Sequence, residues 1–488
     1  VRDRELSCVD VVDDALRRTD AIDSALGAFI TRTPDLAMEQ ARETDRQIQT
    51  ASDPEALPPL AGVPCPIKDL TPVAGVRYTL GSAAFAQQVA DVDDGVVTRL
   101  REAGTLMTGK TSTPELGLPC YTEPDVAPPA RTPWDRARGA GGSSGGAAVA
   151  VAAGMAPIAH GSDGGGSIRI PASCCGLVGL KTTRGRVSPG PYGVDVAGLA
   201  ATGPLARTVA DAAAMLDVLT APWPGDVAAL PPARTTFLDA ARNPPDRPLR
   251  VGLLTEPVIA EDATVHPACR AAAETAAELL ESLGHRVEPV DPPFPAAMWD
   301  TFSAVWAALA ASAPVPHEVE HRLRPMTRYL RERGRHVSAV DYVTAVAGMQ
   351  VLARQVATAW ADVDVVLSPT LADLPAPVGA LRDDADPPSD FAAQTRYTPW
   401  TSVWNLIGRP SISLPLAWHD TPRGVLPVGV MLGGRFADEE TLLALSAQLE
   451  QAAPWAHRYR RLWERLETDV PTRLTPRDDA GAAESERD

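Results

Sequence analysis

The sequence predicts an α/β protein in which a mixed central β-sheet is covered on both faces by helices. Short apolar runs typical of strands alternate along the chain with longer segments whose apolar residues recur at helical spacing. The strand-like run at 363–367 is apolar at every position except Asp364, which is typical of a strand with both faces buried. Because each element must bury its apolar side, this alternation favours helices packed on both faces of one sheet.

The individual elements follow from spacing and capping. Ser7 is a suitable N-cap for a helix over about 9–29, where Val12, Leu16, Ile22 and Leu26 recur at roughly helical spacing. Further helices are expected over 35–49, 95–102, 207–219 and 265–283, through Trp306, and over 343–360. Strands are expected over 61–67, 105–108, 156–159, 176–180, 249–254, 286–290 and 363–367, and the proline-rich segment 221–248 is expected to be a surface connection.

We expect one domain over residues 1–467, with its recognisable motifs concentrated at about 61–211. A chain of 488 residues has room for about three domains, but no long polar linker divides this one. Residues 468–488 are polar and charged with almost no large apolar side chains, which predicts a disordered C-terminal tail.

Charge and cysteine usage exclude several classes of protein. A formal net charge of −17 and a pI near 5.0 argue against a nucleic-acid or anionic-membrane partner, because phosphate groups require a basic face. No apolar stretch reaches the roughly 18 residues of a membrane span, and the first ten residues contain no apolar signal core. The cysteines lack C-x-x-C spacing, which indicates reduced thiols and a cytoplasmic protein. They are Cys8, Cys65, Cys120, Cys174, Cys175 and Cys269.

The chain is organised around Gly139–Arg169, where a glycine-serine loop, an alanine-rich segment and a second glycine-serine loop follow one another. Ser143 and Ser167 stand at the two ends, 24 positions apart, so a helix running away and a chain running back could bring both hydroxyls together. Gly164, Gly165 and Gly166 lack a Cβ, so their backbone can turn successive N–H groups toward one point. Such a nest can hold an oxyanion, and Ser167 stands where a nucleophile would stand.

Lysine usage identifies a candidate base. The chain contains 45 basic residues, but only Lys68, Lys110 and Lys181 are lysines. A guanidinium stays protonated in proteins, whereas a buried amine can lose its proton and act as a base. Lys68 follows an apolar run that would carry it into the interior, and we therefore interpret Lys68 as the base that activates a serine.

These motifs resemble the amidase signature family. The resemblance lies in GVPCPIKDL around Lys68, GGSSGG at 141–146, GSDGGGSIR at 161–169 and CGLVGLKTTRGRVSPG after it, and it continues in GPLARTVAD, NLIGRPSISLP and LPVGVML. It therefore covers most of the chain, and as a set these motifs are highly specific. The core motif is also somewhat similar to that of the cyclic-dimer nylon-oligomer hydrolases. Thr182 stands where the family usually has proline, and Thr132 where asparagine is commoner, and both departures affect loop shape only.

The resemblance implies the amidase signature fold and a Ser-cisSer-Lys relay without metal or organic cofactor. It implies that Ser167 is the nucleophile, Ser143 a bridging serine preceded by a cis peptide, and Lys68 the neutral base. The N–H groups of residues 164–167 would form the oxyanion hole, with Asp163 shaping the loop and Arg169 anchoring it. The substrate would be a small-molecule amide, hydrolysed to acid and amine. A homodimer is left open as the assembly.

The sequence allows five other interpretations. GTLMTGKT at 104–111 matches the phosphate-loop pattern, but its strand and helix context is wrong. HEVEH at 317–321 matches a zinc pattern, but prolines limit it to a short surface helix of about two turns. Gly142–Gly146 matches the nucleophile elbow with Ser144 as nucleophile, but no buried strand precedes it. Within the resemblance, the alternative function is an amidotransferase subunit of the glutamyl-tRNA type that passes ammonia to a partner. A non-catalytic binding protein on the same scaffold is disfavoured by the intact Lys68, Ser143 and Ser167.

Trp400 and Trp404 stand beside NLIGRPSISLP and suggest an apolar acyl side of the site that prefers aryl or long aliphatic amides. The alternative is that both indoles belong to the core.

Overall fold

The computed structural model describes residues 1, 5–53, 56–226, 230–295 and 298–469. The central element of this part of the chain is a mixed sheet of eight strands in the order β4-β6-β5-β10-β11-β9-β7-β8. The strands are β4 Ile158–Asp163, β5 Val178–Lys181, β6 Ala201–Ala206, β7 Arg250–Leu253, β8 Arg286–Pro289, β9 Val365–Pro369, β10 Ser411–Thr421 and β11 Gly424–Gly433. β9, β7 and β8 pair in parallel, whereas the pairs from β4 to β9 are antiparallel.

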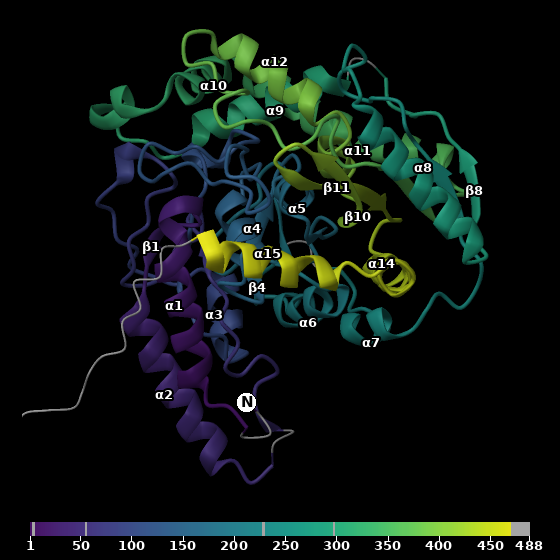
Figure 1. Cartoon of the computed structure of the whole chain (residues 1–488). Helices are drawn as coiled ribbons and strands as arrows, with labels where there is room; N and C mark the ends of the chain where they lie inside the picture. Colours follow the sequence, from purple (N-terminus) through teal and green to yellow (C-terminus); the bar gives the residue numbers. More distant parts are fainter. Residues whose placement is uncertain (2–4, 54–55, 227–229, 296–297, 470–488) are drawn as a thin grey trace, which may run out of the picture.

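Helices cover this sheet on both faces. In β5 and β9 every residue is buried, and successive side chains of a strand point to opposite faces. α5 (Arg169–Cys175) packs on β5, β10 and β11, α6 (Val209–Leu219) on β4, β5 and β6, and α8 (Pro267–Ser282) on β9, β10 and β11 (Figure 1). The predicted fold class, a mixed sheet between helices, is confirmed.

A second, smaller sheet carries two of the three lysines. Its strands are β1 (Phe29–Arg32), β3 (Gly109–Thr111) and β2 (Ile67–Lys68), in the order β1-β3-β2. β2 and β3 are parallel, and Lys68 lies opposite Thr111 while Ile67 lies opposite Lys110. β2 also contacts β4 of the large sheet, so Lys68 is held between the two sheets.

Two groups of the remaining helices lie at opposite ends of the molecule in Figure 1. α1 (Cys8–Leu26) and α2 (Pro34–Thr50) make a hairpin at the bottom of Figure 1, and α9, α10 and α12 form a layer at the top. The other helices are α3 Gly95–Glu102, α4 Gly145–Ala152, α7 Phe237–Arg242, α9 Met298–Ser312, α10 Pro325–Arg335, α11 Ala339–Ala359, α12 Pro387–Tyr397, α13 Ser402–Leu406, α14 Glu439–Ala452 and α15 Ala456–Asp469.

The predicted N-cap of the first helix is confirmed, and its C-terminal end differs from the prediction. The Ser7 side chain accepts a hydrogen bond from Asp10 N–H, and Asp10 bonds back to Ser7 in a capping box, as the N-cap prediction required. The helix ends at Leu26, three residues earlier than expected, because Gly27 adopts a left-handed φ of 69° and its N–H closes onto Asp23 O.

Several expected elements are corrected. The strand expected over 105–108 lies instead at Gly109–Thr111, and the segment 221–248 contains the short helix α7. The strands β6, β10 and β11 of the large sheet were not predicted, nor was α5, a seven-residue helix buried at every position, which leaves no amphipathic signal. α15 runs to Asp469, so residues 468 and 469 are helical rather than part of the expected tail, and residues 470–488, where the rest of that tail was expected, lie outside the described part of the chain.

Candidate active site

The two glycine-serine loops meet as their spacing suggested. The Ser144 N–H donates to Ser167 O over 3.1 Å, which joins the start of α4 to the loop after β4. The Gly142–Ser143 peptide bond is cis. A Cβ on Gly146 would lie 2.2 Å from Ser112 N, so only glycine lets α4 approach β3 this closely. Ser143 and Ser167 are both buried, although Ser167 borders a cleft.

Lys68 contacts Ser143 directly. Its Nζ lies 2.8 Å from Ser143 Oγ, 3.0 Å from Ser162 Oγ and 3.2 Å from Ser162 O, and the side chain is fully buried. Burial lowers the pKa of Lys68 to about 7, although the nearby charge of Asp163 opposes this shift. A large fraction of this amine is therefore neutral near pH 7 and can accept a proton. The sequence did not single out Ser162, which stands between His160 and Asp163 on β4.

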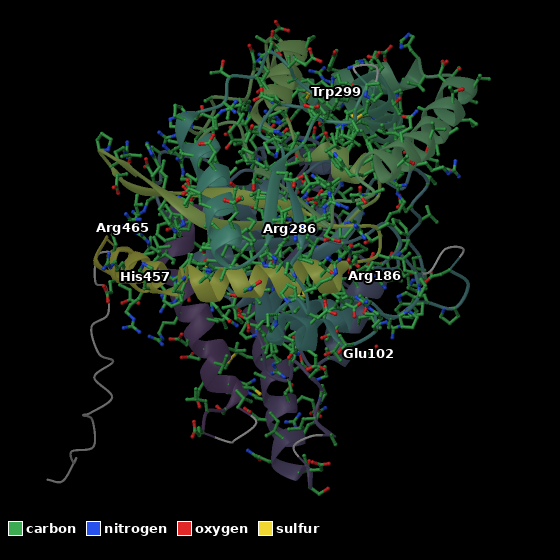
Figure 2. The ribbon with its side chains drawn as sticks, turned by 90° about the vertical axis from the view of Figure 1, so that its right-hand side faces the viewer. Glu102, Arg186, Arg286, Trp299, His457 and Arg465 are labelled. Carbon is green, nitrogen blue, oxygen red and sulfur yellow. The ribbon has the colours of Figure 1, made fainter. Side chains whose placement is uncertain are left out.

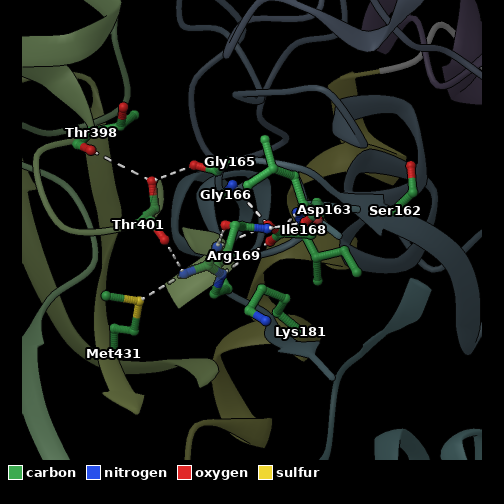
Figure 3. A network of polar contacts seen from close by, with 12 residues as sticks. Ser162, Asp163, Gly165, Gly166, Ile168, Arg169, Lys181, Thr398, Thr401 and Met431 are labelled. Carbon is green, nitrogen blue, oxygen red and sulfur yellow. Dashed lines mark hydrogen bonds and ion pairs between the residues drawn. The ribbon is translucent and has the colours of Figure 1, made fainter. Parts of the chain in front are cut away.

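Asp163 and Arg169 form a fully buried ion pair that shapes the second loop (Figure 3). Arg169 Nη2 and Nε donate to the two carboxylate oxygens over 2.8 and 3.0 Å, and Asn405 Nδ2 donates to Asp163 over 3.0 Å. Burial by itself raises the pKa of Asp163, but Arg169 holds it well below its usual range. Arg169 also donates to Thr401 O over 2.7 Å, which ties the loop to the segment before α13. The structure thus places both residues at the expected loop.

The backbone N–H groups of this loop differ in whether they have a hydrogen-bond acceptor. The Gly166 N–H donates to Asp163 Oδ1 over 2.8 Å, so this group is already paired. Within the described residues, the N–H groups of Gly164, Gly165 and Ser167 have no hydrogen-bond acceptor. The expected oxyanion hole of four N–H donors at 164–167 is therefore reduced to three, because the Gly166 N–H already donates to the Asp163 carboxylate.

The other two lysines have different partners. Lys110 Nζ lies 3.1 Å from Asp69 Oδ1 in an ion pair whose side chains are both fully buried. Burial lowers the pKa of Lys110, and Asp69 raises it. Lys181 donates to Thr182 O over 2.8 Å, and burial lowers the pKa of Lys181 to about 7.

The motifs set aside on sequence grounds take ordinary structural positions. Gly109–Thr111 of GTLMTGKT is strand β3, and HEVEH lies in the 3₁₀ helix η4 (His317–Arg322). No group of three or more His, Cys, Asp or Glu that could hold a metal ion occurs among the described residues. Ser144 Oγ donates to Ser162 O over 3.2 Å, and His160 Nδ1 accepts from the Lys68 N–H over 3.4 Å. Ser144 therefore has no histidine partner in the described part of the chain.

A cleft opens beside Ser167, and its walls differ from the expected ones. It has about 430 Å³ of space, part of it open to solvent. Trp400 and Trp404 are buried core residues outside this lining, and Trp400 Nε1 donates to Glu256 O over 2.8 Å. Of the two interpretations of these indoles, the structure therefore bears out the core and contradicts a place on the acyl side of the site. The aromatic lining comes instead from Trp299, Phe302 and Trp306 of α9 and Phe391 of α12.

Comparisons with known proteins identify the family of this chain. The sequence model of the family described as Amidase matches residues 10–443. The 6-aminohexanoate-cyclic-dimer hydrolase of Paenarthrobacter ureafaciens is 35% identical over 483 residues, which covers 94% of each chain.

Two solved structures resemble the whole fold. A 6-aminohexanoate cyclic dimer hydrolase complexed with substrate superposes with a TM-score of 0.84 at 32% identity, covering 95% of this chain and 97% of that one. A bacterial aryl acylamidase of the amidase signature family gives a TM-score of 0.82 at 26% identity, covering 95% and 96%.

The fold and the matched motifs define a hydrolase that acts on carbon–nitrogen bonds, as the sequence predicted. The chain belongs to the amidase family, the amidase signature enzymes. None of the described helices is long and apolar enough to cross a membrane.

Proposed function

We propose that this protein hydrolyses a small-molecule carboxylic amide to acid and amine through an acyl-enzyme on Ser167. The observation that carries the proposal is the 2.8 Å contact between the buried, easily deprotonated Lys68 amine and Ser143 Oγ, beside the loop that carries Ser167. A hydroxyl becomes a good nucleophile only when a base takes its proton, and this contact supplies the base. The family membership supports the same reaction.

The proposed sequence of steps uses this chain's own groups. Neutral Lys68 takes the Ser143 proton while Ser143 takes the Ser167 proton, and Ser167 Oγ attacks the carbonyl carbon. The oxyanion accepts hydrogen bonds from the free N–H groups of Gly164, Gly165 and Ser167. When the carbon–nitrogen bond breaks, Ser143 returns a proton to the amine. Water, activated by the same relay, then hydrolyses the acyl ester.

Asp163 and Arg169 act as supports in this proposal. Their ion pair and the bond from the Gly166 N–H to Asp163 hold the glycine loop, and the N–H groups of Gly164, Gly165 and Ser167 are left without an acceptor among the described residues. The loop is also tied to Thr401, whose Oγ1 donates to Gly165 O over 2.7 Å (Figure 3). Preorganised donors of this kind need no rearrangement during the reaction.

The test combines trapping with a double-mutant cycle. Ser167→Ala should abolish acyl-enzyme detected by mass spectrometry, and Ser143→Ala should slow its formation by roughly 10²- to 10⁴-fold. Because a relay acts as a unit, Lys68→Met combined with Ser143→Ala should lose far less than the product of the two single losses. An acyl group mapped to Ser144 in the wild-type protein would contradict the assignment of Ser167.

The amidotransferase alternative finds no support at the cleft. A glutamine substrate carries an ammonium and a carboxylate, and no residue lining the cleft beside Ser167, all of them described, carries a charge. We also propose that residues 1–467 form one domain. Limited proteolysis should leave this span intact until global unfolding.

A cytoplasmic location is part of the proposal, because all six cysteines are free and buried. Alkylation of the denatured protein, isolated under conditions that block oxidation, should label all six thiols.

A further inference from the structure

The cleft beside Ser167 has an uncharged lining in which four aromatic rings follow one another. The Trp299 and Phe302 rings stack with centroids 4.9 Å apart at 14°, and Phe302 and Trp306 stack at 5.4 Å and 17°. Phe391 of α12 extends the row, with its ring 5.9 Å from Trp299 at 23°. We call these four residues the ring row. Trp299 and Trp306 are only half-buried, and Trp299 lies in the helical layer at the top of Figure 2.

The ring row lies directly against the loop that precedes Ser167. A Cβ placed on Gly164 would lie 2.9 Å from the Trp306 ring, and one on Gly165 would lie 3.3 Å from Phe302. A side chain at either position would therefore require the Trp306 or the Phe302 ring to shift. A planar group bound along the ring row would be within reach of Ser167, which lines the same cleft.

One polar group in this lining lacks a partner. Ser402, at the start of α13, is 3% exposed, and its Oγ has no hydrogen-bond partner among the described residues. Its Cβ lies 3.9 Å from a Cβ built on Gly165. A buried hydroxyl without a partner is unfavourable, so a ligand atom that pairs with it gains affinity. Three other polar side chains of the lining are engaged: Thr395 and Thr398 donate to backbone carbonyls one turn back, and Gln394 bonds to the Cys120 N–H and to Asp390.

The cleft corresponds to the acyl half of the substrate. In the proposed mechanism Ser143 protonates the leaving amine, so the amine leaves on the side of Lys68 and Ser143. Neither of these residues lines the cleft, whereas Ser167 and Gly165 do. Building on the proposed function, we propose that the cleft binds an uncharged aromatic acyl group stacked along the ring row, with the Ser402 hydroxyl bonding to a polar atom of its ring.

The first experiment compares variants across two series of amides. One series keeps ammonia as the product and varies the acyl group through benzamide, cyclohexanecarboxamide, acetamide and succinamate, and the other compares acetanilide with acetamide. Benzamide should give the highest kcat/KM of the first series, and Trp299→Leu should lower it at least about tenfold while leaving acetanilide nearly unchanged. Trp418→Leu, which replaces a half-buried tryptophan outside the cleft, is the matched control. Preference for acetamide or succinamate, or a larger loss for acetanilide, would overturn the proposal.

The second experiment measures binding without catalysis. Ser167→Ala protein should bind benzamide more tightly than acetamide in calorimetry, and adding Trp299→Leu should weaken benzamide binding about tenfold. If the wild-type protein hydrolyses no amide but this binding depends on Trp299, the proposed function fails and the ring site stands. If hydrolysis depends on Ser167 but benzamide neither binds nor reacts preferentially, the ring site fails alone.

The third experiment isolates Ser402. The three pyridinecarboxamide isomers have the shape of benzamide but place a ring nitrogen at different positions. Ser402→Ala should lower the kcat/KM of at least one isomer, relative to benzamide, by about three- to tenfold, because the comparison with wild type cancels intrinsic reactivity. Equal effects on all four amides would show that the hydroxyl supports the protein rather than the ligand, and would overturn its assignment.

Discussion

Lys68 and Lys110 lie on neighbouring strands and are both fully buried, yet their surroundings differ in one respect. Within the described part of the chain, Lys110 has a carboxylate partner, Asp69, at 3.1 Å, whereas the hydrogen bonds of Lys68 Nζ go to the hydroxyls of Ser143 and Ser162 and to a carbonyl. Burial disfavours the charged form of both amines; the nearby charge of Asp163 opposes this effect at Lys68, and a direct ion pair with Asp69 opposes it at Lys110. Two identical side chains, one strand apart, are thus suited to opposite tasks.

The difference teaches how the fold separates structure from chemistry. An ion pair with a buried carboxylate stabilises the protonated lysine and makes it a structural cation. Hydroxyl neighbours satisfy the amine through hydrogen bonds without supplying a negative charge, so a neutral amine is retained at moderate pH. The expected consequences differ in kind, since changes at Lys68 should affect turnover and changes at Lys110 should affect stability.

The largest expected effect is the loss of turnover in Lys68→Arg. A guanidinium keeps the charge but does not release its proton near neutral pH, so amide kcat should fall by at least about 10³-fold. Thermal unfolding is the folding control, with Lys68→Met as a second variant in case the larger guanidinium does not fit. Near-normal kcat in a folded Lys68→Arg protein would remove Lys68 from the mechanism.

Next in size is the stability loss in Lys110→Met. This change leaves Asp69 buried without its cation, which costs about 3–5 kcal/mol of unfolding free energy. Adding Asp69→Asn should restore much of it, because the uncompensated charge is then gone. Urea denaturation measures both variants, and an unchanged midpoint for Lys110→Met would show that the ion pair is not the structural element inferred from its burial.

A smaller effect is expected in the pH profile. Because the neutral form of Lys68 is the base and its pKa is lowered to about 7, kcat/KM should rise with pH and level off above about 7. Below that pH it should fall about tenfold per unit. Lys181, whose pKa is also lowered to about 7, is the matched control, and Lys181→Met should keep the same limb. If the fall in kcat/KM at low pH disappeared in Lys181→Met, the titrating group would be Lys181 and not Lys68.

The smallest effect concerns the HEVEH segment. If the base is a lysine, replacing His317 and His321 by alanine should change kcat less than about twofold. Both histidines lie in η4, far from Ser167 in the sequence, and neither lines the cleft beside Ser167. Activity should likewise persist after exhaustive chelation. A large loss of activity, together with stoichiometric zinc in the untreated protein, would show that a metal rather than Lys68 activates the nucleophile.

Much of this protein could be predicted from local sequence signals. The scarcity of lysine pointed to Lys68, the glycine runs located the loop at Asp163–Ser167, and the alternation of apolar runs predicted the mixed sheet. These features are encoded by residues close together in the chain, where backbone freedom, capping and burial leave a direct pattern. The assignment of Lys68, Ser143 and Ser167 as catalytic residues remains a prediction for the trapping experiment and the Lys68 variants.

Only the tertiary structure decided which residues surround these motifs. Ser162 reaches Lys68, and Asp163 takes the Gly166 N–H, through contacts that no spacing rule specifies. The aromatic lining comes from Trp299 and Phe391 rather than from Trp400 and Trp404, because α9 and α12 pack over the loop while the other indoles turn into the core. An apolar side chain has the same local signature in a core and in a cleft, since both remove it from water. Which of the two it enters depends on packing between distant segments, and that is set by the fold as a whole.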